Sequence, residues 1–377
     1  MATGVYTVEI KWDGSTWTDE SERCQDIHIV RGRADDLQVV EAGTCDLTLE
    51  DNDGRFNPAN AASPLYPHVK PLRAVRVRAT YDSVVYDLFA GYTRAGESDS
   101  GMETRRAQIE CVDAFLLLHR VRPTIAAVAT TTGGAIGLLL DAVGFPGGAS
   151  RSLQIGDSIT FSADGSATAL GMIAGLLLAE RGQFFISAGG VATYLDRHAQ
   201  NRSPYTSSQA TIADGMRAIA PGFDLEQVRN RATVTSEGGT PQAHEDAASV
   251  AEYNYSDYGP ITSPYLGTDA KALSLAKYLV LKRKDGVPPV RYLDLENGDA
   301  ATFEALLARE LGDRITATDD ASGTDGDYHI LRIEHRIAGR DGARVHRCSW
   351  GLLRRDTAAQ PFLIGISTIG GPDVITY

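Results

Sequence analysis

The strongest constraint on the fold is an alternation of polar and apolar residues that recurs through the N-terminal third of the chain. Val5–Trp12 reads VYTVEIKW, in which every second residue is apolar. A period of two puts the apolar side chains on one face of the backbone, which is typical of a half-buried β-strand. Further segments of this character, separated by turn-forming residues, are Ile27–Arg31, Thr44–Glu50, Ala74–Tyr81, Val84–Gly91 and Arg106–Val112. Residues 1 to about 115 are therefore expected to form a β-barrel or sandwich.

The following segment has a helical periodicity. Thr131–Gly144 carries apolar residues at helical spacing, although its glycines leave the start of the helix open. Ser166–Arg181 predicts a clearer helix, with Ser166 as its N-cap. Gln183–Asp196 follows with two short apolar segments around a Gly-Gly turn, which predicts a β-hairpin.

Strand character returns at Val228–Thr235. Glu237–Tyr265 is rich in glycine, proline, serine and aspartate and is expected to be a long surface loop or arm. Asp269–Lys284 predicts a helix that ends before two consecutive prolines. The remaining expected strands are Val290–Leu295, Arg314–Thr318, Tyr328–Ala338 and Ala343–Leu353, with a hairpin turn at Arg340–Gly342 between the last two.

These elements predict an α+β fold that is mainly β. A chain of 377 residues is long enough for two or three domains. The expected divisions are residues 1–119 as an N-terminal β-barrel, 120–204 as a helix and hairpin insert, 205–355 as a second β-barrel interrupted by a loop and helix at 237–290, and 356–377 as a C-terminal tail. The tail alternates apolar residues with turn formers, so it either docks on another subunit or completes its own barrel.

The charge balance is acidic, with 36 lysines and arginines against 49 aspartates and glutamates and a formal net charge of −13. This balance disfavours a nucleic-acid-binding surface, because phosphate recognition needs clustered positive charge. The charge keeps a protein soluble, and it is also compatible with a channel through which DNA slides.

The four cysteines lie far apart and form no CxxC pair, so they are expected to be small buried apolar residues of a protein folded in the cytoplasm. Met1–Lys11 lacks the hydrophobic core of a signal peptide. Ala167–Arg181, the most apolar helical stretch, is shorter than the ~20 residues that a membrane span needs. A soluble product is expected.

Motifs for catalysis and cofactor binding are absent from the sequence. There is no phosphate-binding loop, dinucleotide fingerprint, zinc-protease helix or nucleophile elbow. Asp51–Gly54 resembles part of a twelve-residue calcium loop, but Leu49 and Asn60 would then occupy the first and last ligand positions, where such a loop has aspartate and glutamate. A tight turn between strands is the better interpretation.

Several titratable residues are candidates for chemistry. His329, His335 and His346 lie in the last predicted hairpin, where cross-strand pairing is favoured over a metal or proton-relay site. The paired carboxylates Asp35-Asp36 and Asp319-Asp320 lie in turn-like sequence, which favours solvated turn residues over an acid and base pair. Glu110 and Asp113 lie at the end of a strand, but the sequence places no further catalytic residue type beside them. We therefore predict no catalytic, cofactor-binding or metal-binding residue, and a protein that is not an enzyme.

One segment carries a specific resemblance. Within Val30–Arg78, a strand leads to Asn-Asp-Gly-Arg-Phe at Asn52–Phe56, then to Asn60 and to Ser-Pro-Leu-Tyr-Pro at Ser63–Pro67. This order resembles the N-terminal domain of tail hub and minor tail proteins of long-tailed phages, with Leu65 as a mild departure. Weaker matches continue at Phe89–Tyr92, Leu140–Pro146, residues 166–196, Val228–Thr235, the helix at 269, Leu311–Asp313 and Cys348–Leu352.

The resemblance implies two barrel domains similar to tail-tube protein, and a trimer that presents six barrels with pseudo-sixfold symmetry. Such a baseplate hub joins the tail tube and distal tail ring to the tail tip, spike or fibre. It surrounds the channel for DNA ejection and contacts the host envelope indirectly. A virion tail component of a phage or a gene transfer agent, assembled in the host cytoplasm, is the expected function.

Three other functions compete with this expectation. A distal tail protein would form a ring of six copies with one barrel each, whereas two β-rich regions are expected here. A tail-associated glycan hydrolase would need two carboxylates in a cleft. A carbohydrate-binding sandwich would need exposed aromatic platforms, and 7% of the residues are aromatic.

Overall fold

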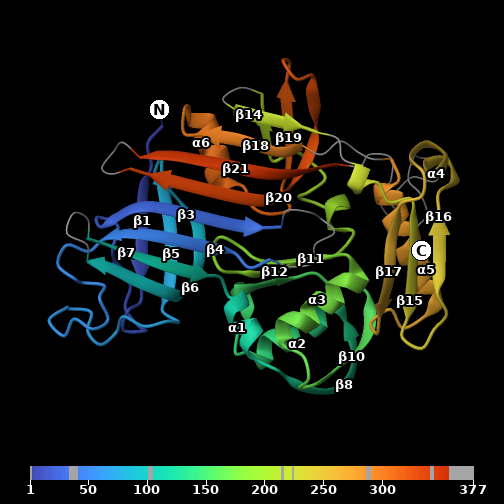
Figure 1. The fold of residues 1–377 in the computed structure, drawn as a ribbon, viewed down its shortest axis with the longest axis horizontal. Coiled ribbons are helices and arrows are strands. Elements are labelled where there is room, and N and C mark those ends of the chain that lie inside the picture. The colour runs from blue at the N-terminus through green and yellow to red at the C-terminus, as the bar shows by residue number, and fades with distance from the viewer. Residues whose placement is uncertain are drawn as a thin grey trace.

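The computed structural model describes residues 2–33, 41–100, 105–213, 216–222, 225–285, 290–339 and 344–355. Its largest feature is a 13-stranded, mostly antiparallel sheet, accompanied by smaller sheets and helices (Figure 1). The predicted α+β, mainly β fold is confirmed. The turn predicted at Arg340–Gly342 and the tail at 356–377 lie outside the described residues.

The strands expected in the N-terminal region form one half of the main sheet. In β1, β3, β4, β5 and β7 one face is buried and the other is not, as the sequence predicts, whereas Val84 and Val85 at the start of β6 are exposed. For example, β1 buries Tyr6, Val8 and Ile10. The strands of this region are β1 (Val5–Ile10), β2 (Thr18–Asp19), β3 (Cys24–Gly32), β4 (Thr44–Glu50), β5 (Ala74–Tyr81), β6 (Val84–Ser100) and β7 (Arg105–Val112), of which the sequence did not predict the short β2.

The C-terminal region completes the same sheet. Its strands are β13 (Ala210–Ile212), β14 (Met216–Pro221), β18 (Val290–Glu296), β19 (Arg314–Asp319), β20 (Thr324–Ala338) and β21 (Val345–Arg354). β20 pairs with β3 from Arg332 opposite Gly32 to Ala338 opposite Asp26. The order β14-β18-β21-β20-β3-β4-β7-β6-β5-β1-β2 therefore runs without a break through both β-rich regions. A single hydrophobic core, which includes Ile29 and Trp350, extends behind both.

The insert packs below the main sheet in Figure 1 and has a core of its own. It contains α1 (Phe115–Arg120), β8 (Thr124–Thr131), α2 (Thr132–Ala142), a 3₁₀ turn (Gly148–Ser150), β9 (Arg151–Leu153), β10 (Ser158–Asp164), α3 (Ala169–Glu180), β11 (Gln183–Ile186), β12 (Ala192–Leu195) and a second 3₁₀ turn (Ala199–Asn201). The predicted Ser166 cap is wrong. Thr168 caps α3 by accepting from the Gly171 N–H, because Ser166 instead donates its hydroxyl to Asp164 in a preceding turn.

The prediction of a long loop at Glu237–Tyr265 is wrong as well. The segment contains β16 (Gln242–Glu245), α4 (Ala247–Tyr253) and β17 (Asp257–Ser263), which join β15 (Arg231–Ser236) and α5 (Asp269–Arg283) in a small peripheral unit after a 3₁₀ turn at Leu225–Gln227. β15 pairs in parallel with β17, and Ile261 is buried against the helix. This pairing skips β16 and α4, so local periodicity does not indicate it.

The helix α6 (Ala300–Ala308) was not predicted. Asp299 caps it by accepting from the Thr302 N–H, and Phe303, Leu306 and Leu307 enter the main core. Its short length explains why its periodicity is weak in the sequence.

A partly buried ion pair joins the insert to both β-rich regions. Arg31 of β3 donates to Glu310 over 2.5 Å. The other carboxylate oxygen of Glu310 accepts from the Ala188 N–H of the insert over 2.8 Å. One carboxylate therefore bonds to segments from the beginning and the middle of the chain.

Candidate functional site

The outer face of the main sheet carries a row of charged side chains. Because side chains alternate along a strand, residues such as Ile333 and Cys348 enter the core while their neighbours point outward. The strand register places the outward residues in one line, which we call the charged row. From β18 to β7 its members are Glu296, Arg347, Arg336, His28, Asp46 and Glu110.

At one end of the charged row, Glu296 lies between two arginines. Arg217 Nη1 of β14 and Arg347 Nε of β21 donate to Glu296 Oε2 over 2.5 and 3.1 Å. Burial alone raises the pKa of the Glu296 carboxyl, but the hydrogen bonds from Arg347 and Arg217 outweigh it and lower that pKa. The carboxylate therefore stays ionised between its two partners.

Glu334 of β20 is held by basic partners in the same way, beside Arg336 of the charged row. Its carboxylate oxygens accept from Arg336 Nε over 2.7 Å and from Arg332 Nη2 over 3.2 Å, and lie 3.0 Å from His28 Nε2 of β3. Partial burial raises the pKa of Glu334, but the hydrogen bonds from Arg336 and His28 outweigh it and lower the pKa to about 2. Glu334 thus links a strand of the C-terminal region to a strand of the N-terminal region.

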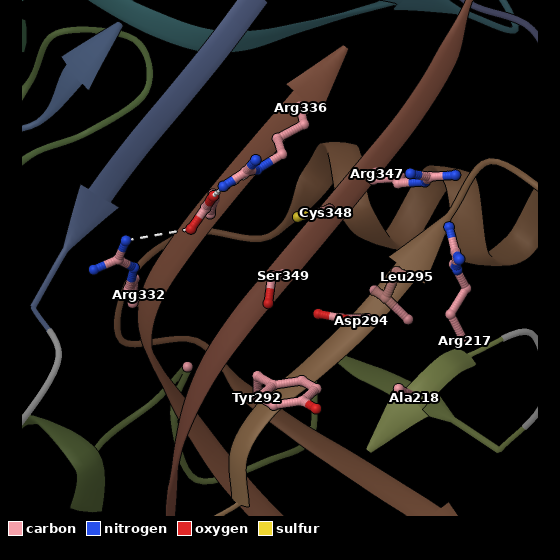
Figure 2. Close-up of a pocket in the computed structure, with 12 residues that line it drawn as sticks. Arg217, Ala218, Tyr292, Asp294, Leu295, Arg332, Arg336, Arg347, Cys348 and Ser349 are labelled. Atoms are coloured by element: carbon pink, nitrogen blue, oxygen red, sulfur yellow. Dashed lines mark hydrogen bonds and ion pairs between the residues drawn. The ribbon is translucent and has the colours of Figure 1, made fainter. Parts of the chain in front are cut away.

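A shallow hollow of about 580 Å³ lies over these side chains, between β14, β18, β21 and β20. Figure 2 shows Arg217, Arg347 and Arg336 on three different strands around Asp294 and Ser349, which lie in the middle of the view. Tyr292 stands at one side and is 43% exposed. Each of the four arginines that line it contacts Glu296 or Glu334, so four positive charges share two carboxylates, and Asp294 on the same surface adds a third negative charge.

The buried face of the same strands holds two of the predicted histidine candidates. His335 Nδ1 lies 2.9 Å from His346 Nε2, and His346 Nδ1 lies 2.9 Å from the Tyr6 hydroxyl. Complete burial lowers the pKa of both imidazoles, that of His346 to about 3. Cross-strand pairing is therefore confirmed for this pair. His329 lies elsewhere, with its Nδ1 3.2 Å from the Gly312 carbonyl.

The structure separates the other sequence candidates. Asp51 forms the expected turn, accepting from the Phe56 N–H and from the Ser98 hydroxyl. Asp113 is buried and accepts from the N–H groups of Gly43 and Phe115, and burial raises its pKa to about 7. Glu110 points outward instead and pairs with Arg94.

The remaining acidic candidates add no site. Asp319 accepts from Ser322 in an exposed turn. Asp35-Asp36 lies outside the described residues. Across the portion of the chain that the structure describes, no cluster of histidine, cysteine, aspartate and glutamate is arranged to hold a metal ion. The prediction of no catalytic, cofactor-binding or metal-binding residue stays a prediction.

Sequence reasoning did not identify the charged row. Its local signal is visible in Arg332-Ile333-Glu334-His335-Arg336, where charges of opposite sign alternate with buried residues. The partners on β3, β4 and β18 are distant in the chain, and their alignment depends on the strand register.

No protein-family model matches the chain, and no curated protein matches it. Solved structures do. A 43 kDa tail protein of prophage MuSo2 from Shewanella oneidensis has a TM-score of 0.62 at 13% identity, covering 92% of this chain and 96% of that one. A tail protein from Neisseria meningitidis MC58 has a TM-score of 0.62 at 12% identity, covering 93% and 97%.

This chain has the fold of prophage tail proteins. Prophage tail protein gp18 from Listeria monocytogenes EGD-e agrees, with a TM-score of 0.56 at 10% identity over 93% of this chain and 95% of that one. The resemblance predicted from Asn52–Phe56 and Ser63–Pro67 is thereby confirmed at the level of the fold. Among the described residues, no helix is both long and apolar enough to span a membrane.

Proposed function

We propose that this tail-protein fold serves as a structural subunit of a tail hub in a virion. Three copies form a ring with pseudo-sixfold symmetry, which joins the tail tube and distal tail ring to the tail tip, spike or fibre. DNA passes through the ring without specific binding, and the subunit catalyses no reaction. The observation that carries the proposal is the continuous sheet that unites two β-rich regions of one chain.

The two β-rich regions lie side by side because β3 pairs with β20. Within the described residues, β14 pairs with β18 alone, and the second half of β6 pairs with β7 alone. These two segments are the free edges of the sheet portion that carries the charged row. Unpaired edges favour pairing with another chain, and a closed ring removes them. Three copies joined edge to edge then present six β-rich regions around one axis.

In this arrangement the charged row faces the channel. Free lysines and arginines on such a surface would retain DNA by neutralising its phosphates. The four arginines beside Glu296 and Glu334 share these two carboxylates, and Asp294 and Asp46 on the same face bring the number of carboxylates to four. The surface is therefore hydrated and polar but offers few cations to phosphate, which suits passage of DNA without retention.

The likeness to the tail proteins spans more than nine-tenths of each chain, so the proposal concerns the whole described fold. We also retain the domain division into 1–119, 120–204, 205–355 and 356–377 as a proposal, with the two β-rich regions as tail-tube-like barrels that share one sheet.

Native mass spectrometry and electron microscopy of the purified chain, alone and with a distal tail protein of the same particle, test the oligomeric state. A trimeric ring supports the proposal. A ring of six copies supports a distal tail protein instead. A monomer that releases sugars from envelope glycans supports a hydrolase and contradicts the hub.

Cysteine cross-linking tests the edge contact. Ala218→Cys on β14, combined with Glu97→Cys on β6, is expected to give disulfide-linked dimers and trimers on oxidation of the assembled ring. The native cysteines are not expected to form cross-links, because burial raises the pKa of the thiols of Cys24, Cys45, Cys111 and Cys348 and so disfavours the reactive thiolate. Each single variant is the control. Assembled rings without cross-links, also with Ala95→Cys in place of Glu97→Cys, contradict this contact.

A further inference from the structure

A small basic cavity lies where the insert, the peripheral unit and the main sheet meet. It has a volume of about 80 Å³ and is lined by the end of α3, the residues after β12, α5 and the turn before β19. Five basic residues line it, against one carboxylate, that of Asp196; the basic residues are Arg33, Arg181, Arg197, Lys282 and Arg283. The cavity is separate from the charged row and lies within a single copy of the chain.

Arg181 is the most informative of these residues. It follows the last residue of α3 with φ at 58°, in the left-handed region that usually takes glycine. Its Nε and Nη2 atoms are buried and have no hydrogen-bond partner, and its guanidinium lies 5.0 Å from the Tyr258 ring centroid. These two donors have almost no surface that water can reach, so an ion in the cavity interacts with the charge of the guanidinium without accepting from them.

Lys282 brings a second uncompensated charge to the cavity. Its Nζ atom lies 6.0 Å from the ring centroid of Tyr278 on the same helix. Among the described residues neither Lys282 nor Arg181 forms an ion pair with a carboxylate. Both are therefore available to a ligand of opposite charge.

The nearby carboxylates are already engaged. Arg197 pairs with Asp157 over 2.8 Å and with Glu180 over 3.5 Å. Asp196 is bound by Arg202 and also accepts from the His198 N–H. The protein thus provides anions for Arg197 and Arg202, but leaves the positive charge of Arg181 and Lys282 without an anion of its own.

We propose that this cavity binds a tetrahedral oxyanion of the size of phosphate or sulfate. A volume of about 80 Å³ has room for roughly six water-sized spheres, which suits an ion of five heavy atoms. The guanidinium of Arg181 contributes positive charge, and the ammonium group of Lys282 is a point charge with donors for the oxygens of such an ion. The ion connects Arg181 at the end of α3 with Lys282 on α5, so it ties the peripheral unit to the insert.

The test is thermal unfolding of the full chain with increasing phosphate, sulfate or chloride at matched ionic strength, together with a ³¹P NMR titration of inorganic phosphate. Phosphate and sulfate are expected to raise Tm by several degrees and to saturate at millimolar concentration, while chloride does not. Arg181→Gln and Lys282→Gln are each expected to weaken binding about tenfold or more, since each removes a positive charge beside the ion.

Arg120→Gln, an exposed arginine at the end of α1, is the matched control and keeps the response. If Arg181→Gln does not fold, Arg181→Lys and Lys282→Gln report on the site in its place. An equal rise of Tm in all variants indicates exclusion of the anions from the whole protein surface and overturns the proposal. The absence of any saturable rise also overturns it. Neither result concerns the oligomeric state, so the hub proposal is tested separately.

Discussion

The two faces of β20 and β21 accommodate polar side chains in opposite ways. On the buried face, Tyr6, His335 and His346 form a neutral hydrogen-bonded chain inside the core. On the outer face, one residue away along each strand, Glu334 and Arg347 are fully charged members of ion-paired groups. The backbone is common to both faces, so the difference comes from access to water.

The two faces are therefore expected to contribute very differently to the stability of the fold. Groups on the buried face have no water to replace a lost partner, so each contact there contributes strongly to the free energy of unfolding. Ion pairs at the surface contribute about 0–1 kcal/mol, because water solvates the charges when the pair is broken. A substitution on the outer face therefore costs little stability, while a substitution on the buried face disrupts packing. The following predictions test this contrast.

The largest effect is expected for Trp350→Ala on the buried face. Trp350 is fully buried in the core that unites the two β-rich regions, so the cavity and lost contacts should lower the free energy of unfolding by about 3–5 kcal/mol. Urea denaturation followed by circular dichroism measures the change. Ser349→Ala, the outward neighbour, is the control and should stay within about 0.5 kcal/mol. Equal losses in both variants would contradict the contrast.

A smaller loss is expected for His346→Leu. The substitution leaves the Tyr6 hydroxyl and His335 Nδ1 without their buried partner, which costs about 1–3 kcal/mol at neutral pH. His68→Leu, at an exposed position, is the matched control. A stability equal to that of the parent chain would mean that the hydrogen-bonded chain is replaceable by apolar packing.

The same variant changes the pH dependence of stability. Burial lowers the pKa of His346 to about 3, whereas an unfolded histidine has a pKa of about 6.5. Between these values the unfolded chain binds a proton that the folded chain does not, so this residue's contribution is present above pH 6.5 and is lost as the pH falls. His346→Leu should therefore reduce the slope of unfolding free energy against pH by up to about 1.4 kcal/mol per pH unit. An unchanged slope between about pH 6 and 4 would show that the pKa of His346 is the same in the folded and the unfolded chain.

The smallest stability effect is expected on the outer face, where the functional effect is largest. Glu296→Gln combined with Glu334→Gln should cost at most about 1–2 kcal/mol. It releases the arginines of the charged row, so affinity for duplex DNA should rise and become more dependent on salt. Fluorescence anisotropy with labelled DNA measures both. Glu237→Gln with Glu252→Gln gives the same change in charge away from the charged row. An equal gain in DNA affinity for this control variant would contradict the proposed channel.

Local periodicity accounts for most of the individual elements. Most strands of the N-terminal region, α2 and α5 agree with the sequence because a single amphipathic face determines each, and the β11–β12 hairpin agrees because a Gly-Gly turn separates two short apolar segments. The failures share a cause. α6 is short, and β17 depends on pairing with β15 across an intervening strand and helix, so neither has a strong local pattern.

The amino-acid sequence by itself determined the mainly β character of this chain and the resemblance to tail proteins, because alternation and turn residues act over a few positions. Tertiary structure alone decided that β3 joins β20, that Glu296 and Glu334 align with charges from distant strands, and that Arg181 meets Lys282 at one cavity. Register and packing between remote segments are global properties, set by the burial of the whole core rather than by any one stretch of residues.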